Sequence, residues 1–374
     1  MGTNAVQNCT AVIISSVTEI RDLHRTSLFP DPLTTLSPSF FLASINPRMW
    51  TPRVVVLKSA GAVVGVVYTK ELTVAGIKTG ILYGDNTLGM MLIADPADRP
   101  ELLRIGLGAL LRCESVRGIR LLMPPDGFEL DAIKSNHLLE QVEVSSAPAE
   151  NHSYLALHRD YETFLRTLGP RTRRNLRYYR RRFVEEGHTY IPEISIEDLR
   201  ESASAFSSQS VIGSSSDGIK RALNMFSCVR QPWFAGLRHR DGSCLSVIGG
   251  WREADDATLF LQMNDDRKYP AGSLSLVMRG YVIEDLIAEG VPRLRFWAGA
   301  SGALARYVTP VPARRFYIDR STISWRIFRS SIQFLGPLFP SRADWIRDWI
   351  TPSSADRDEG LGEEMSSTKW SLKA

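Results

Sequence analysis

The chain has 374 residues, of which 44% are hydrophobic and 23% charged, and a net charge of +4. This composition excludes a disordered chain, and the length is typical of two domains. No window is apolar for long enough to cross a membrane, the N-terminus lacks the pattern of a signal peptide, and the four cysteines form no metal-ligand pair. We therefore expect a cytoplasmic protein without a bound metal.

The first half of the chain predicts three strands, a helix and a fourth strand. Two β-branched runs flank the turn residues 59–62, which predicts a hairpin over 53–68. A third strand is expected at Ile77–Tyr83, an amphipathic helix at Glu101–Glu114 and a further strand at Ile119–Met123.

The second half repeats this order, which suggests an internal duplication of one fold. A short strand at Ser153–Leu157 and a helix capped by Asp160 come first. The repeated elements are then expected as a hairpin over Trp233–Arg252, a strand at Thr258–Met263, a helix over Gly272–Glu289 and a strand at Leu294–Trp297.

We expect domains at 1–150 and 151–321, with Ser145–Pro148 as the connector between them. Residues 322–374 predict two amphipathic helices followed by a loose tail. The helices are expected to pack on the second domain, with peripheral membrane contact through 322–350 as the alternative.

A basic helix is predicted over Leu168–Gly187. It contains all seven arginines between Arg171 and Arg182 and no acid in that interval, so the rest of the chain carries a net charge of about −3. The positive charge is therefore local, and a local field indicates an anionic partner.

Three interpretations of this helix are open. Its arginines form an ordinary solvated face, or Arg173, Arg174 and Arg177 bind an anionic acceptor or the phosphates of a cofactor. In the third interpretation Tyr178 and Tyr179 stack on nucleic acid beside the arginines.

A second basic segment, Arg267–Ser273, lies between a predicted strand and a predicted helix. A helix N-terminus offers unpaired N–H groups and the positive end of a dipole, so it favours anions. Gly272 would let a phosphate approach the backbone, and Arg267 and Lys268 add positive charge. The alternative is an ordinary capped loop, because the spacing fits neither a Walker loop nor a dinucleotide fingerprint.

These features together resemble the GNAT superfamily of acyltransferases. The basic helix follows a strand and a short helix, and Tyr269–Leu274 resembles the family's Tyr-x-x-x-Gly loop before the cofactor helix. More closely, residues 150–320 resemble the CelD/BcsL-type branch with a BioF2-like acetyltransferase domain. The tandem arrangement is also similar, more distantly, to that of the FemABX transferases.

The resemblance implies an α/β (α+β) fold of tandem GNAT-like domains, each a mixed central sheet flanked by helices. It implies acetyl-CoA or another acyl-CoA as co-substrate, and an amine of a small molecule or of a cell-envelope or polysaccharide precursor as acceptor. The thioester would lie between the strands at Thr258–Met263 and Leu294–Trp297. The cofactor-binding residues would be Arg267, Lys268, Tyr269, Gly272, Ser273 and Leu274.

Three side chains are candidates for the proton transfers of such a reaction. Asp265 and Glu253 are the candidate bases, with solvated surface acids as the alternative. Tyr307 occupies the place where the family often has a thiolate-protonating tyrosine, with a packed core tyrosine as the alternative. The family's acid in the last strand is missing, since that strand has the sequence Arg295-Phe296-Trp297.

Two other functions therefore stay open beside the N-acyltransferase. The first is a FemABX-like transferase that takes its acyl group from aminoacyl-tRNA, with the basic helix bound to the tRNA. If the protein is instead an N-acyltransferase, we expect no nucleic-acid partner. The second is a non-catalytic binding module on a GNAT scaffold.

Overall fold

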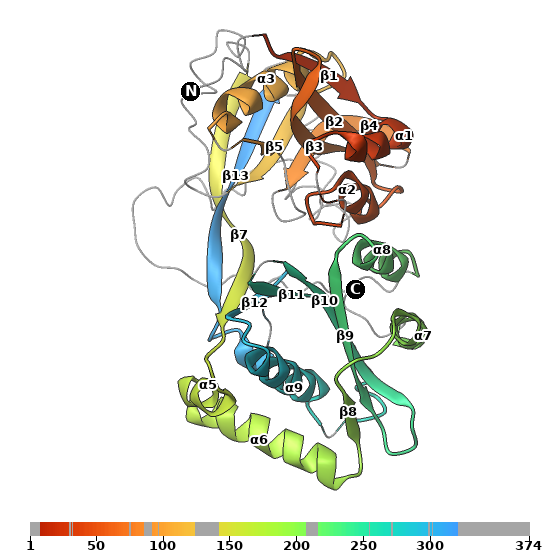
Figure 1. Ribbon diagram of the computed structural model, residues 1–374, viewed down its shortest axis with the longest axis vertical. Coiled ribbons are helices and arrows are strands. Elements are labelled where there is room, and N and C mark those ends of the chain that lie inside the picture. Colours follow the sequence, from red (N-terminus) through yellow and green to blue (C-terminus); the bar gives the residue numbers. More distant parts are fainter. Residues whose placement is uncertain are drawn as a thin grey trace, which may run out of the picture. The chain divides into compact units, whose positions relative to one another are not determined.

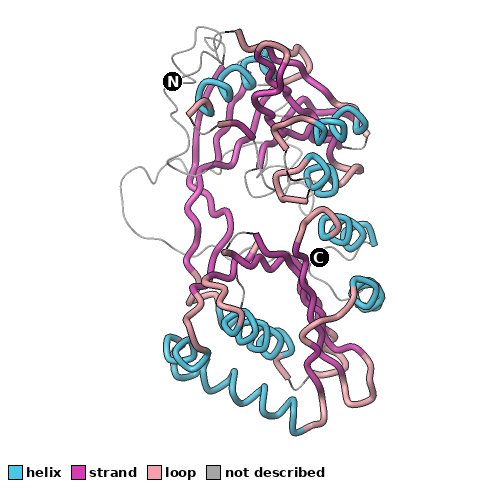
Figure 2. Tube along the Cα trace, in the orientation of Figure 1, coloured by secondary structure: helices cyan, strands magenta, loops and turns pink. Residues whose placement is uncertain are grey.

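A computed structural model describes residues 8–320, apart from 86–91, 124–141, 207–215 and positions 30, 32, 75, 96, 254, 271, 298, 299 and 301. The chain divides into two compact units, and each is described by itself. The first contains residues 1–150 together with the strand residues 312–320, and the second contains residues 151–311. Figures 1 and 2 show strands and helices in both.

The first unit is built on a mixed sheet with the strand order β1-β2-β3-β4-β6-β13, to which β5 adds by pairing with β3. The pairing of β4 with β6 is parallel, and the other neighbours are antiparallel. The strands are β1 (Thr10–Ile14), β2 (Trp50–Ser59), β3 (Ala62–Val74), β4 (Ile77–Asp85), β5 (Leu92–Ala94), β6 (Gly118–Met123) and β13 (Thr309–Arg320).

Alternate residues of this sheet enter two separate cores. Val55 and Leu57 of β2 pack with the leucines of α3 (Arg99–Arg112). Val54 and Val56 pack on the other face with α1 (Val17–Asp22), α2 (Pro38–Ser44) and the 3-10 turn Leu23–Arg25. Because both faces are covered, the central strands are apolar nearly throughout, as in other buried mixed sheets.

A buried ion pair joins β6 to β13. Arg120 and Asp319 are 1% and 5% exposed, and the Arg120 guanidinium lies 2.7 Å from a carboxylate oxygen of Asp319. The guanidinium also lies over the ring of Tyr317, 5.1 Å from its centroid. The pair therefore connects two strands that are nearly 200 residues apart in the sequence.

Replacing Asp319 by Asn should lower the free energy of unfolding by about 3–5 kcal/mol, because it leaves the Arg120 charge buried without its carboxylate. Urea unfolding followed by circular dichroism measures this change. The double variant Arg120→Met/Asp319→Leu should recover most of the loss. An Asp319→Asn chain as stable as the parent would contradict the role of the pair.

The second unit has a sheet with the strand order β7-β12-β11-β10-β9-β8. Helix α9 lies on one face of this sheet with α5 and α6 beyond it, and α7 and α8 lie on the other face (Figure 1). The strands are β7 (Val142–Ala156), β8 (Thr189–Ile191), β9 (Gln231–Arg238), β10 (Cys244–Glu253), β11 (Asp256–Asn264) and β12 (Arg293–Phe296). The helices are α5 (Tyr161–Thr167), α6 (Pro170–Glu185), α7 (Ile196–Phe206), α8 (Ser216–Phe226) and α9 (Leu274–Ala288), and a 3-10 turn covers Gly302–Leu304.

The expected mixed α/β fold is confirmed, and the two units repeat one order of elements. In each, an antiparallel hairpin and a third strand precede a helix, and the next strand is parallel to the third: β4 with β6, and β11 with β12. Each parallel strand then pairs antiparallel with a strand from elsewhere in the sequence, β6 with β13 and β12 with β7.

Two local expectations differ from the structure. Ser145–Pro148, expected as a connector, lies inside β7, where the hydroxyl of Ser146 accepts a hydrogen bond from Arg314 of β13 at 2.7 Å. Strand β13 was not expected at all. The helices and tail expected at 322–374 lie outside the described residues. In the described part of the chain, no helix is both long and apolar enough to cross a membrane.

Candidate functional site

The sheet of the second unit opens between β11 and β12. The two strands pair in parallel only from Asp256 to Leu259, and the last link is the Trp297 N–H, which donates to the Leu259 carbonyl at 3.1 Å. Strand β11 continues to Asn264. Residues 260–264 of β11 therefore have no paired strand, among the described residues, on the side where β12 pairs with residues 256–259. The next helix, α9, begins beside this end of the sheet.

A β-bulge lies at the residue where this pairing ends. Gly249 and Gly250 of β10 oppose Leu261 and Leu259, so Phe260 is an extra residue in β11. A Cβ atom on Gly250 would lie 1.7 Å from the Thr258 carbonyl oxygen, so the close approach of β10 to β11 requires glycine there. A bulge bends its strand and increases the local twist, which directs the end of β11 away from β12.

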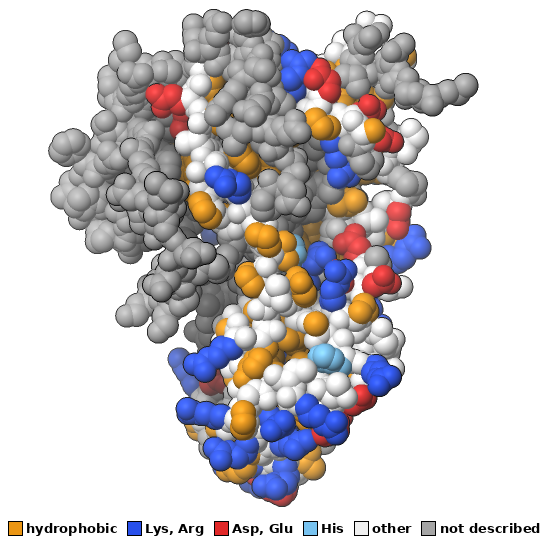
Figure 3. Space-filling view, turned by 90° about the vertical axis from the view of Figure 1, so that its left-hand side faces the viewer, with side chains coloured by type: hydrophobic (Ala, Val, Ile, Leu, Met, Phe, Trp, Pro, Cys, Tyr) orange, Lys and Arg blue, Asp and Glu red, His pale blue; other side chains and the backbone are white. Residues whose placement is uncertain are grey.

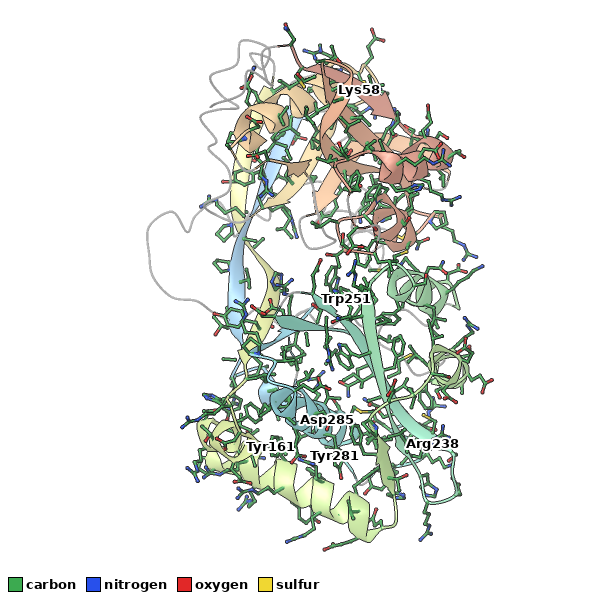
Figure 4. The ribbon with its side chains drawn as sticks, in the orientation of Figure 1. Lys58, Tyr161, Arg238, Trp251, Tyr281 and Asp285 are labelled. Atoms are coloured by element: carbon green, nitrogen blue, oxygen red, sulfur yellow. The ribbon has the colours of Figure 1, made fainter. Side chains whose placement is uncertain are left out.

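An aromatic cluster covers the bulge on the α8 face. Phe260 contacts Trp251, Trp297 and Phe226, with ring centroids 5.4, 5.7 and 5.9 Å away. Trp251, labelled on β10 in Figure 4, is 1% exposed. Such tilted and edge-to-face contacts stabilise the bulged conformation and fix Trp297 after β12.

Polar side chains lie on the α9 face of the same region. The Nε atom of Arg279 donates to the Gln262 side-chain oxygen at 2.8 Å, and the Gln262 amide nitrogen donates to the Ser275 carbonyl at 3.3 Å. The Arg279 guanidinium lies 5.5 Å from the centroid of Phe296, which is opposite Ser153 in the pairing of β12 with β7. Burial lowers the pKa of Arg279 to about 10. The sequence analysis missed these residues, although an arginine among the apolar residues of α9 was a visible signal.

The loop before α9 is fixed by an aromatic ring. Tyr269 is buried, and a Cβ atom on Gly272 would lie 1.7 Å from its Cε1 atom. The packing of Tyr269 therefore explains why residue 272 is glycine, without any need for a phosphate to approach the backbone there. Burial and the neighbouring Glu186 carboxylate raise the pKa of Tyr269.

The other predicted cofactor-binding residues differ in accessibility. Lys268 forms an ion pair with Asp241 of the β9–β10 turn at 3.1 Å, whereas Arg267 is exposed. Ser273 is the N-cap residue of α9 but makes no side-chain capping bond. Leu274 is fully buried in the core, so only its backbone could meet a ligand.

The two candidate bases lie at opposite ends of β11. Glu253 ends β10 and pairs with Asp256 at the start of β11, whereas Asp265 follows Asn264 at its other end, roughly 26 Å away at the usual rise of a strand. Only Asp265 lies at the open end. Its carboxylate accepts from the Lys268 N–H at 3.1 Å, so it also shapes the turn.

Tyr307 lies at the start of the basic helix α6. Its hydroxyl accepts a hydrogen bond from the Gly169 N–H at 2.8 Å and lies 3.3 Å from the Thr172 hydroxyl. These bonds, that of Thr172 first, lower the pKa of Tyr307 because they stabilise the phenolate.

Helix α6 forms a basic surface at one end of the second unit (Figure 3). Arg177 forms an ion pair with Glu162, and Arg173 and Arg174 have no ion-pair partner among the described residues. Between α5, α6 and α9 is a shallow groove of about 460 Å³. In it the Arg180 guanidinium lies 4.0 Å from the Tyr281 centroid and donates a hydrogen bond to the Tyr161 hydroxyl at 2.8 Å. Both tyrosines are labelled in Figure 4.

A buried histidine lies beside the loop that precedes α9. His188 packs 4.6 Å from the ring of His239 and 5.0 Å from that of Tyr269. Its Nδ1 atom accepts from the Arg240 N–H at 3.1 Å, and its Nε2 atom lies 3.5 Å from Glu186. Burial, reinforced by His239 and Arg240 and opposed by Glu186, lowers the pKa of His188.

Several solved structures are similar to this chain at low sequence identity. The C-terminal domain of a protein assigned as a lysylphosphatidylglycerol synthetase from Agrobacterium fabrum has a TM-score of 0.50 and 11% identity, over 86% of this chain and 97% of that chain. A tandem GNAT protein from the clavulanic acid biosynthesis pathway has a TM-score of 0.46 and 12% identity, over 84% and 99%. A crystal structure of FemX has a TM-score of 0.45 and 12% identity, over 77% of this chain and 88% of that chain.

No protein-family model matches the sequence, and no curated protein matches it either. The Agrobacterium structure shows the fold, which agrees with the mixed α/β fold expected from the sequence.

Replacing Gly272 by Ala should destabilise the protein by about 1–3 kcal/mol, because the new methyl group overlaps the Tyr269 ring. The second change Tyr269→Leu should recover part of this loss, so the two effects will not add. A double-mutant cycle by urea unfolding measures the coupling. Strict additivity would show that the ring does not determine the residue at 272.

The free energy of unfolding should fall as the pH is lowered through about 6.5, in part because of His188. Its folded-state pKa lies below the ordinary value of 6.5, so the unfolded chain binds this proton first. The loss should end once the pH is below the folded-state pKa. His188→Gln, whose amide oxygen can accept from the Arg240 N–H, should flatten the profile between pH 7.5 and 5.5, as measured by urea unfolding at each pH.

Proposed function

We propose that this protein is an acyl-CoA-dependent N-acyltransferase that works at the opening between β11 and β12. The observation that carries the proposal is the separation of two parallel strands after Leu259, directly beside the N-terminus of α9. A thioester placed along residues 260–264 would have backbone N–H groups of β11 beside its carbonyl oxygen. Such donors stabilise the oxyanion that forms when an amine attacks.

The start of α9 supports binding of the cofactor's pyrophosphate. This 15-residue helix begins at Leu274, so the N–H groups of its first turn and its dipole favour an anion there. The exposed Arg267 would add a positive charge, and Tyr269, Gly272 and Ser273 would set the loop backbone. Lys268 would act indirectly, through its ion pair with Asp241.

Proton transfers can then use Asp265 at the open end of the sheet and Tyr307 at the start of α6. Asp265 would accept the proton of the attacking ammonium, and Tyr307 would protonate the leaving thiolate. Glu253, at the other end of β11, would take no part in the same step. Positioning of the two substrates would supply most of the rate, so a strong base is not required.

The acceptor in this proposal is a small-molecule amine or an amine of a cell-envelope or polysaccharide precursor, and the acyl group is acetyl. Arg173, Arg174 and Arg177 would bind an anionic part of that acceptor. The reaction would take place in the cytoplasm, in a chain of two GNAT-like domains, 1–150 and 151–321, followed by 322–374.

Titration calorimetry with acetyl-CoA tests the proposal. Wild type should bind, and Arg267→Glu should bind at least about tenfold more weakly through loss of a phosphate partner. The control Arg200→Glu makes the same charge change at an exposed position of α7 and should bind like wild type. A thiol assay with a panel of amines should detect CoA release, and Tyr307→Phe should lower kcat.

Absence of both acetyl-CoA binding and CoA release would reject this function. A second candidate is then favoured by Arg173 and Arg174, which have no ion-pair partner among the described residues: transfer from aminoacyl-tRNA. It requires tRNA binding that weakens steeply with salt and with Arg173→Gln/Arg174→Gln. A chain that binds a ligand without any turnover would instead be a non-catalytic module.

A further inference from the structure

The end of α5 and the start of α6 form a basic patch at one end of the second unit. Its arginines are exposed or half-exposed and have no ion-pair partner in the part of the chain that the structure describes: Arg166, Arg171, Arg173, Arg174 and Arg306. The first four lie within nine positions of one another in the sequence. A hydrogen bond from the Gly169 N–H to the Tyr307 hydroxyl brings the segment with Arg306 to the same place.

The carboxylates at this end of the unit do not neutralise the basic patch. Asp160 caps α5, where it accepts a hydrogen bond from the Thr163 N–H at 2.8 Å. Glu162 forms an ion pair with Arg177, and the glutamates at the far end of α6 pair with arginines of the same turn. Positive charge therefore predominates over the first two turns of α6, and a local positive field attracts an anionic partner.

The outward face of α6, opposite its buried Leu176 and Phe183, carries apolar side chains as well as arginines. Tyr178 is 45% exposed and Val184 is 59% exposed. At 3.6 residues per turn, both lie on the same side of the helix as Arg174. Figure 3 shows basic side chains gathered at this end of the second unit, with hydrophobic side chains among them.

The surface of a membrane with anionic lipids matches this combination of side chains. Helix α6 has 16 residues and is about 24 Å long, so its outward face can lie along a plane. A helix in that orientation places basic side chains among the headgroups and apolar side chains at the boundary with the acyl chains. Tyrosine is enriched at the same level, and each basic side chain adds attraction to an anionic leaflet.

The groove beside α6 does not favour a nucleic-acid strand as the partner. Proteins that hold a single strand follow its phosphates with a basic groove. This groove is instead lined by the carboxylates Glu162, Glu185 and Glu284, and its Arg180 is already paired with Glu284. A strand that entered it would be repelled, whereas a plane that touched the outward face would meet the basic patch and the exposed apolar side chains.

We propose that the second unit docks on membranes that contain anionic phospholipids, through the basic patch and the outward face of α6. Tyr178 and Val184 would lie at the level of the headgroups. The proposal goes beyond the N-acyltransferase function and does not depend on it, since Arg166 and Arg171 have no part in that reaction. Because salt screens the attraction between exposed charges, binding should require anionic lipid and weaken as salt is added.

Vesicle flotation with the full chain tests the proposal. Wild type should bind vesicles of phosphatidylcholine with about 30% phosphatidylglycerol, and should not bind phosphatidylcholine alone. Arg166→Gln/Arg171→Gln should weaken binding at least about 20-fold, because each basic side chain near an anionic leaflet contributes about fivefold. The control Arg200→Gln/Lys220→Gln removes the same charge from exposed positions of α7 and α8, and should bind within about twofold of wild type.

Val184→Gln distinguishes a lipid surface from a nucleic acid. A valine side chain makes apolar contact with lipid but does not stack on bases, so this variant should bind anionic vesicles about threefold more weakly. Its binding to a single-stranded RNA oligonucleotide should equal that of wild type. The melting temperature should not change, since the side chain is mostly exposed.

Absence of binding to anionic vesicles would overturn the proposal. Equal binding of Arg166→Gln/Arg171→Gln and its control would also overturn it, and would place the contact elsewhere, such as in residues 322–350. Tighter binding of RNA than of vesicles, lost in the same double variant, would reject the membrane in favour of nucleic acid. Acetyl-CoA binding and CoA release are measured separately and without vesicles, so the docking surface and the N-acyltransferase function can fail independently.

Discussion

The extra residue in β11 is the constraint on which the second unit depends. Strand β10 can follow β11 through the bulge only because Gly249 and Gly250 have no side chains, and a Cβ atom on Gly250 would overlap the Thr258 carbonyl. The bulge changes the course of β11 at the residue where its parallel pairing with β12 ends. The aromatic rings of Trp251, Phe260 and Trp297 stabilise that arrangement from the α8 face. An opening in a continuous sheet exposes backbone donors, and fixed backbone donors are well suited to stabilise an oxyanion.

The two faces of this opening have different chemistry. Aromatic rings fill the α8 face, whereas the α9 face contains the guanidinium of Arg279, the amide of Gln262 and the hydroxyl of Ser153, which has no hydrogen-bond partner among the described residues. Polar groups of this kind cost stability in an apolar core unless they are paired.

Most arginines in the second half of α6 form ion pairs within the second unit. Arg177, Arg180, Arg181 and Arg182 all have carboxylate partners within the unit, whereas Arg173 and Arg174 near the start of the helix have none in the part of the chain that the structure describes. Arg180 also stacks on Tyr281, which in turn stacks on Tyr190 at 4.5 Å. Arg180 therefore joins α6 to α9, and Arg177 joins it to α5.

The sequence by itself determined the order of the elements, because hairpins, helix caps and amphipathic faces depend on neighbours a few residues away. The hairpins, the strand–helix–strand units and the helix with Leu176 and Phe183 on its buried face were all predictable in this way. Tertiary structure decided the rest. Strand β13 and the first part of β7 are strands because distant residues complete their hydrogen bonds, which no local pattern records. The same holds for the site: Gly272 predicted a phosphate loop, but its contact with Tyr269 appears only in the fold. Likewise, Ser153, Gln262 and Arg279 are more than 100 residues apart at the extremes and are brought to one face of the sheet only by the pairing of β7 with β12 and of β12 with β11.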